Sequence, residues 1–128
     1  MKMRTAYFKV PNMEKALAFW RALFQSEPCK KSPYWSEFRC DNINLALLWM
    51  ENFEIQKDQA NFVPVFELND SEFEVVKSRA LLAGASIVVD VADHPDKKSY
   101  VLADVFGNEF EITRFHDEHQ AVDSSCGV

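Results

Sequence analysis

The segment GNEFEITRF, residues 107–115, contains the clearest structural pattern in the sequence. A glycine turn precedes a run in which apolar and polar side chains alternate, which is the pattern of a strand with one buried face. Phe110 and Ile112 fall on the buried face, and Glu111 falls on the opposite one. Glu111 could therefore hold a metal ion, act as a catalytic base or belong to a hydrogen-bond network.

The residues before this strand predict the rest of one structural unit. FVPVFEL, residues 62–68, has the composition of a strand, and Ser71 followed by Glu74 predicts a capping box at the start of a helix. Gly84 predicts the end of that helix at about Ala83. The helix has a buried stripe of Phe73, Val76 and Ala80, and the strands after it are Ser86–Val91, Ser99–Ala103 and Phe110–Phe115.

The first half of the chain predicts a similar unit. TAYFKV, residues 5–10, indicates a strand, and Asn12 supplies a side-chain oxygen that can cap the following helix. The apolar stripe of this helix is Met13, Leu17, Trp20 and Phe24, and the two strands after it are Trp35–Cys40 and Ile43–Met50.

The two halves align at an offset of 58 residues, which pairs Val10 with Leu68 and Asn12 with Asp70. We therefore predict an α+β fold in which two βαβββ modules form a cupped mixed β-sheet with the helices on the outside. The modules span about residues 1–50 and 61–116 of a single domain, 1–118, with residues 51–60 as a linker and 119–128 as a disordered tail. The alternative is a chance likeness of two amphipathic helices, because helical stripes resemble one another.

Composition and charge narrow the class of protein. The chain has 128 residues, of which 48% are hydrophobic, and this is enough for one domain with a real core. No run approaches the roughly 18 apolar residues of a membrane span, and no secretory segment opens the chain, so we expect a cytoplasmic protein without a membrane partner. A net charge of −6 argues against nucleic acid as a partner. Three irregularly spaced cysteines, Cys29, Cys40 and Cys126, are interpreted as free thiols.

The paired βαβββ units, the helix opening NMEKALAFW (residues 12–20) and the ending DVFGNEFEI (residues 104–112) together resemble the vicinal oxygen chelate superfamily. This superfamily includes glyoxalase I, bleomycin-resistance proteins and extradiol dioxygenases. The ending departs from the usual family pattern, D-P-x-G-N-x-x-E, because Val105 and Phe106 replace the proline and the residue after it.

The resemblance also implies where a metal would bind. Metal-dependent members place four ligands in the cup, one from the first and one from the last strand of each module. The corresponding residues here are Thr5, Leu47, Val63 and Glu111. Valine and leucine have no donor atom, so we predict no metal and no other cofactor. His94, His116 and His119 are interpreted as solvated side chains and not as ligands.

Strand alternation predicts what lines the cup. If Thr5 points inward, then so does Tyr7, and the same reasoning applies to the other strands. The candidate ligand-binding residues are Thr5, Tyr7, Leu47, Trp49, Val63, Val65, Glu111 and Thr113, with Lys9, Tyr7 and Thr5 as candidate partners of Glu111. A largely apolar and aromatic lining with few polar groups is typical of small-molecule pockets.

These residues favour a metal-independent small-molecule binding protein, similar to the bleomycin-resistance branch, that holds an aromatic and potentially cationic ligand. The alternative is an enzyme, a lyase, isomerase or dioxygenase with a non-standard or metal-free site that uses Glu111. No catalytic residue is assigned. The resemblance also implies a homodimer in which the neighbouring chain completes each cup. A third possibility is an interaction module whose cup is filled by its own or a partner's side chains.

Overall fold

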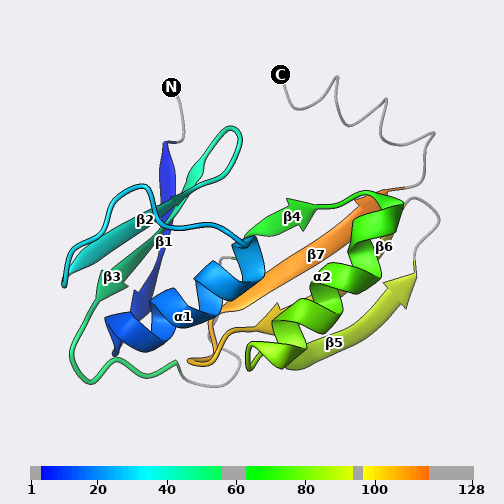
Figure 1. Cartoon of the computed structure of the whole chain (residues 1–128). Coiled ribbons are helices and arrows are strands. Elements are labelled where there is room, and N and C mark those ends of the chain that lie inside the picture. Colours follow the sequence, from blue (N-terminus) through cyan, green and yellow to red (C-terminus); the bar gives the residue numbers. More distant parts are fainter. Residues whose placement is uncertain (1–3, 56–62, 94–96, 116–128) are drawn as a thin grey trace.

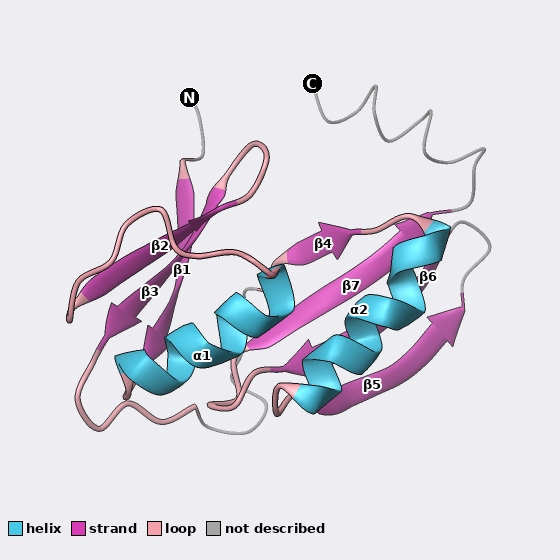
Figure 2. Cartoon of the chain, in the orientation of Figure 1, coloured by secondary structure: helices cyan, strands magenta, loops and turns pink. Residues whose placement is uncertain are grey.

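The computed structural model describes residues 4–55, 63–93 and 97–115. Two helices and seven strands follow one another along these residues (Figures 1 and 2). In chain order they are β1 (Thr5–Val10), α1 (Met13–Phe24), β2 (Trp35–Arg39), β3 (Asn44–Trp49), β4 (Val65–Glu67), α2 (Asp70–Leu82), β5 (Ser86–Asp93), β6 (Lys97–Ala103) and β7 (Glu109–Phe115).

The strands form two mixed sheets. The N-terminal sheet has the order β1-β3-β2, and the C-terminal sheet has the order β4-β7-β6-β5. In each sheet the first strand of the module pairs in parallel with the last one, and the other pairs are antiparallel. A single bridge between Lys30 and Glu37 lies where the C-terminal module has β5. The α+β fold with two related modules is therefore confirmed, with one strand of the first module reduced to this bridge.

The helices begin where side chains can satisfy their first amide groups. In α1 the Asn12 side chain accepts a hydrogen bond from the Lys15 amide at 3.0 Å. In α2 the N-cap is Asn69, which forms a capping box with Glu72. The predicted box of Ser71 and Glu74 is wrong by two residues. The Ser71 hydroxyl donates to the Asn69 side chain instead of capping the helix itself.

One hydrophobic core joins the two modules. Trp20 on α1 is fully buried and contacts Phe8 of the N-terminal sheet, with 5.6 Å between the ring centroids. It also contacts Phe110 of the C-terminal sheet at 5.1 Å. In Figure 1, α1 extends from the N-terminal sheet towards β4, and α2 lies across the C-terminal sheet. The stripes predicted for both helices are thus confirmed as core residues.

The turn before β7 forms a hydrogen bond between the two modules. Asp104 is buried, and its carboxylate accepts hydrogen bonds from the amides of Phe106 and Asn108, each at 2.9 Å. Burial raises the pKa of Asp104 above its ordinary value. The Asn108 side chain donates to the carbonyl oxygen of Lys9 at 3.3 Å, which ties the turn to the end of β1. Gly107 has φ of 91°, so this turn needs glycine even without the family proline.

Among the described residues, no helix is long and apolar enough to cross a membrane.

Candidate functional site

Each sheet has one face covered by the helices and one face turned away from them, here called the helix-free face. In β1, Phe8 and Val10 lie in the core, so Thr5, Tyr7 and Lys9 belong to the helix-free face. In β7, Phe110 and Ile112 lie in the core, and Glu111 belongs to the helix-free face. The predicted orientation of these two strands is confirmed.

The predicted orientation of β3 is wrong by one residue. Leu47 pairs with Phe8 and lies fully buried in the core, so it does not belong to the helix-free face. Trp49 pairs with Val10 and packs against the same core, and its indole N–H donates to the carbonyl oxygen of Pro11 at 3.2 Å. Ala46 takes the place expected for Leu47. The run LALLW is apolar at every position, so alternation could not reveal which face each residue occupies.

The partners of the Glu111 carboxylate differ from the three that were predicted for it. Thr113 donates its hydroxyl to Glu111, and the Lys97 ammonium lies 3.4 Å from the same carboxylate oxygen. The Glu111 side chain is only 16% exposed. Its partners thus come from β6 and β7 of its own module, whereas Thr5, Tyr7 and Lys9 belong to the other module. The interpretation of Glu111 as part of a hydrogen-bond network has direct support in these contacts.

The remaining predicted residues of the C-terminal module differ in accessibility. Val65 pairs with Glu111 across β4 and β7 and is 54% exposed. Thr113 lies two residues further along β7 but is fully buried. Val63 is half-buried and lies two residues before the start of β4. Among these three, Val65 offers the most accessible surface to a ligand.

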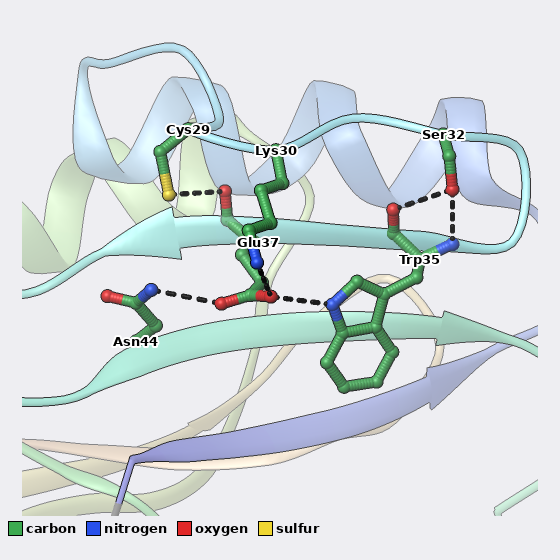
Figure 3. Close-up of polar contacts among 6 residues, drawn as sticks. All are labelled: Cys29, Lys30, Ser32, Trp35, Glu37 and Asn44. Atoms are coloured by element: carbon green, nitrogen blue, oxygen red, sulfur yellow. Dashed lines mark hydrogen bonds and ion pairs between the residues drawn. The ribbon is translucent and has the colours of Figure 1, made fainter.

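A second carboxylate, missed in the sequence analysis, lies on the helix-free face of the N-terminal sheet (Figure 3). Glu37 on β2 accepts hydrogen bonds from the Trp35 indole N–H at 2.7 Å and from the Asn44 side chain at 2.9 Å. The Lys30 ammonium lies 3.6 Å from it. The Glu37 side chain is only 7% exposed. These hydrogen bonds, with a smaller contribution from Lys30, hold the pKa of Glu37 below its ordinary value.

Glu37 belongs to a row of residues that crosses the N-terminal sheet. Tyr7 pairs with Ala46, Ala46 with Glu37, and Glu37 with Lys30. The small Ala46 side chain separates Tyr7 from the carboxylate, and the Tyr7 ring meets the Trp35 ring edge-on with 5.4 Å between centroids. Tyr7 is 50% exposed. An accessible aromatic pair therefore lies next to a fixed carboxylate.

The C-terminal sheet has a corresponding row, but its carboxylate lies on β7, the counterpart of β3, instead of on the counterpart of β2. Val65 pairs with Glu111, Glu111 with Val101, and Val101 with Val89. Glu111 thus corresponds in position to Ala46, and Val101 corresponds to Glu37. Among the described residues, each module has one glutamate–lysine pair on its helix-free face, but only the N-terminal row adds aromatic side chains. The alternation of WSEFR in β2 could have predicted that Glu37 and Trp35 share a face of the sheet. The hydrogen bond from Asn44 could not be predicted in this way, because it depends on the pairing of β2 with β3.

The metal-ligand positions that the fold implies do not fit a divalent ion. With the corrected register they hold Thr5, Ala46, Val63 and Glu111, which together offer one hydroxyl and one carboxylate. Such an ion requires several oxygen, nitrogen or sulfur ligands. Across the described residues, no three His, Cys, Asp or Glu side chains gather in a way that could hold a metal. His94, His116 and His119 lie outside the described residues.

A cleft of about 1070 Å³ separates the modules at another place. It lies between the end of α1, the β2–β3 turn, β4 and α2, and its walls include Phe24, Arg39, Phe66 and Arg79. Of the eight predicted ligand-binding residues, Val65 alone lines it. None of Tyr7, Glu37 and Glu111 lines this cleft, although Asn44, which donates to Glu37, does.

Comparison with known proteins places the fold. No protein-family model matches the sequence, and no curated protein matches it significantly. Among solved structures, a glyoxalase-related enzyme from Fulvimarina pelagi superposes with a TM-score of 0.76 at 14% identity, covering 89% of this chain and 88% of that chain. A glyoxalase/bleomycin resistance protein/dioxygenase family enzyme from Burkholderia phytofirmans PsJN gives 0.75 at 15% identity, covering 91% and 100%.

The fosfomycin resistance protein FosX from Mesorhizobium loti is also similar, with a TM-score of 0.70 at 14% identity over 94% of this chain and 96% of that chain. All three likenesses extend over nearly the whole chain. The protein therefore has the fold of the vicinal oxygen chelate superfamily, as the βαβββ repeat and the ending DVFGNEFEI predicted.

Proposed function

We propose that the protein is a metal-independent small-molecule binding protein of the glyoxalase and bleomycin-resistance type, which holds an aromatic ligand on its helix-free faces. The observation that carries the proposal is the row on the N-terminal sheet, where the exposed Tyr7 ring and the Trp35 ring lie beside the Glu37 carboxylate. Aromatic faces stack on planar ligands, and a carboxylate attracts a positive charge. The four positions that would hold a metal in this fold offer only two donor groups, which supports binding of the ligand without a metal.

A homodimer would give each ligand a more enclosed site. Tyr7 and Val65 lie on different sheets and are each about half exposed, so one chain leaves both surfaces accessible. Small-molecule pockets usually bury most of the ligand, which a second chain packed against these surfaces would achieve. Light scattering at micromolar concentration should therefore give twice the chain mass of 14.8 kDa. A monomer at that concentration would exclude the version of the site that two chains share.

Binding can be tested by quenching of tryptophan fluorescence with a panel of planar aromatic compounds, both cationic and neutral. We expect saturable quenching that is weakened by Tyr7→Ala. The matched control is Tyr34→Ala, because Tyr34 is also exposed but its ring contacts Trp49 instead, with 5.9 Å between centroids. Uniform lack of quenching across the panel, or equal loss in both variants, would contradict the proposal.

The alternative, a lyase, isomerase or dioxygenase that uses Glu111, is favoured by one observation. Glu111 and Lys97 form a partly exposed pair 3.4 Å apart, and such a pair could exchange a proton with a substrate. Elemental analysis of protein purified without a chelator or an affinity tag distinguishes a metal-dependent enzyme from the metal-independent binding protein. Stoichiometric zinc, nickel, manganese or iron would overturn the metal-independent proposal.

A further inference from the structure

The Glu37 carboxylate is built as a rigid acceptor on the helix-free face of the N-terminal sheet. Its two oxygens are held by different neutral donors, one by the Trp35 indole N–H and the other by the Asn44 side chain. These donors come from β2 and β3, so the carboxylate keeps its orientation without help from a ligand (Figure 3). A charged group fixed in this way needs no rearrangement when it binds an ion of opposite charge.

The charge of Glu37 is balanced only loosely. Its cationic neighbour is the Lys30 ammonium, and their separation of 3.6 Å exceeds the 2.7–2.9 Å of the two neutral contacts. The Lys30 side chain is 62% exposed, and it belongs to a single bridge instead of a full strand. The Lys30 ammonium is therefore solvated already and can return to water when another cation takes its place, while the two neutral donors continue to hold the carboxylate.

We propose that Glu37 binds the positively charged group of an aromatic amidinium or ammonium ligand, and that the Lys30 ammonium occupies this position until the ligand displaces it. The inference rests on the proposed function and specifies its ligand class and counter-charge. The ring of such a ligand would lie against Tyr7 and Trp35, which are in contact with each other next to the carboxylate. Glu111 is not this counter-charge, because the less exposed Lys97 ammonium and the buried Thr113 hydroxyl already engage it.

The test is a titration followed by nuclear magnetic resonance, with benzamidine as the cationic probe and benzamide as its neutral counterpart of equal shape. The chain has three tryptophans, and the indole N–H signal of Trp35 is assigned from the Trp35→Phe variant. We expect saturable shifts of this signal and of the Lys30 and Glu37 amides with benzamidine, and a much weaker response to benzamide.

Two variants with a matched control decide the roles. Glu37→Gln should weaken benzamidine binding by about ten-fold or more, the range expected for losing a hydrogen bond to a charged group. Lys30→Ala should tighten it by about two- to five-fold, because a competing exposed cation is removed. Lys31→Ala removes the same charge at the neighbouring position and should leave the affinity for benzamidine unchanged.

The outcomes separate this inference from the proposed function. If planar compounds bind through Tyr7 but Glu37→Gln leaves benzamidine affinity unchanged, Glu37 is a structural group only and the inference is overturned while the binding function stands. The same conclusion follows if Lys30→Ala does not tighten binding relative to Lys31→Ala. If neither probe nor any other planar compound shifts a residue of the helix-free faces, both proposals fail.

Discussion

Replacing Glu37 with glutamine tests the physical account of the N-terminal sheet through stability. Glutamine keeps the shape of glutamate, but its amide oxygen can accept from only one of the two donors, the Trp35 indole or the Asn44 side chain. A hydrogen bond to a charged group contributes about 1.5–3 kcal/mol, and the lower desolvation of a neutral side chain offsets part of its loss. We therefore expect Glu37→Gln to lower the free energy of unfolding at pH 7 by about 1–2 kcal/mol.

The pH dependence of this difference is the sharper observation. The pKa of Glu37 is lowered in the folded state from its ordinary value of 4.5, so the folded protein binds this proton less readily than the unfolded chain. The carboxylate's contribution is complete above pH 4.5 and is lost as the pH falls through the lower, folded-state pKa. The difference between wild type and variant should thus shrink in acid.

Urea unfolding followed by circular dichroism, at pH 7 and at several values below 4.5, measures the difference. Asp104 changes stability with the opposite sign, because its pKa is raised in the folded state, but it is present in both proteins and cancels from the difference. A gap between the two proteins that stays constant with pH would refute the assignment of Glu37 as an ionised acceptor. Equal stability at pH 7 would refute the energetic value given to its hydrogen bonds.

Two further predictions concern packing. Leu47→Ala should lower the free energy of unfolding by about 2–5 kcal/mol, because Leu47 is fully buried. Leu48 is half-buried on the helix-free face, so Leu48→Ala should lower it clearly less. Equal losses in urea unfolding would contradict the corrected register of β3. Gly84→Ala should cost more than about 1 kcal/mol, because Gly84 has φ of 111° and an added Cβ would lie 2.8 Å from Val105. Adding Val105→Ala should recover part of this loss in thermal unfolding, and no recovery would assign the whole cost to backbone strain.

Much of the fold could be read from local pattern. The spacing of apolar residues predicted both helices, and Gly84 marked the end of α2, where its positive φ permits the chain to turn. Alternation set the faces of β1 and β7, because polar side chains there separate apolar ones. In β3 the same method failed, since a strand apolar on both faces contains no alternation to interpret.

The candidate site depended far more on the fold. The sequence singled out Glu111 and proposed Lys9 as one partner, but the register brings Lys97 and Thr113 to it. Glu37 was overlooked because two of its partners come from other segments of the chain. Asn44 lies on β3, and Lys30 lies outside any strand.

Residue type and spacing along short segments were enough to predict the repeated module and the positions of both helices. The residues around each carboxylate and the buried face of β3 became known from the folded structure. The reason is physical: these contacts join different strands, and a shift of one residue in strand pairing exchanges every side chain between the two faces of a sheet.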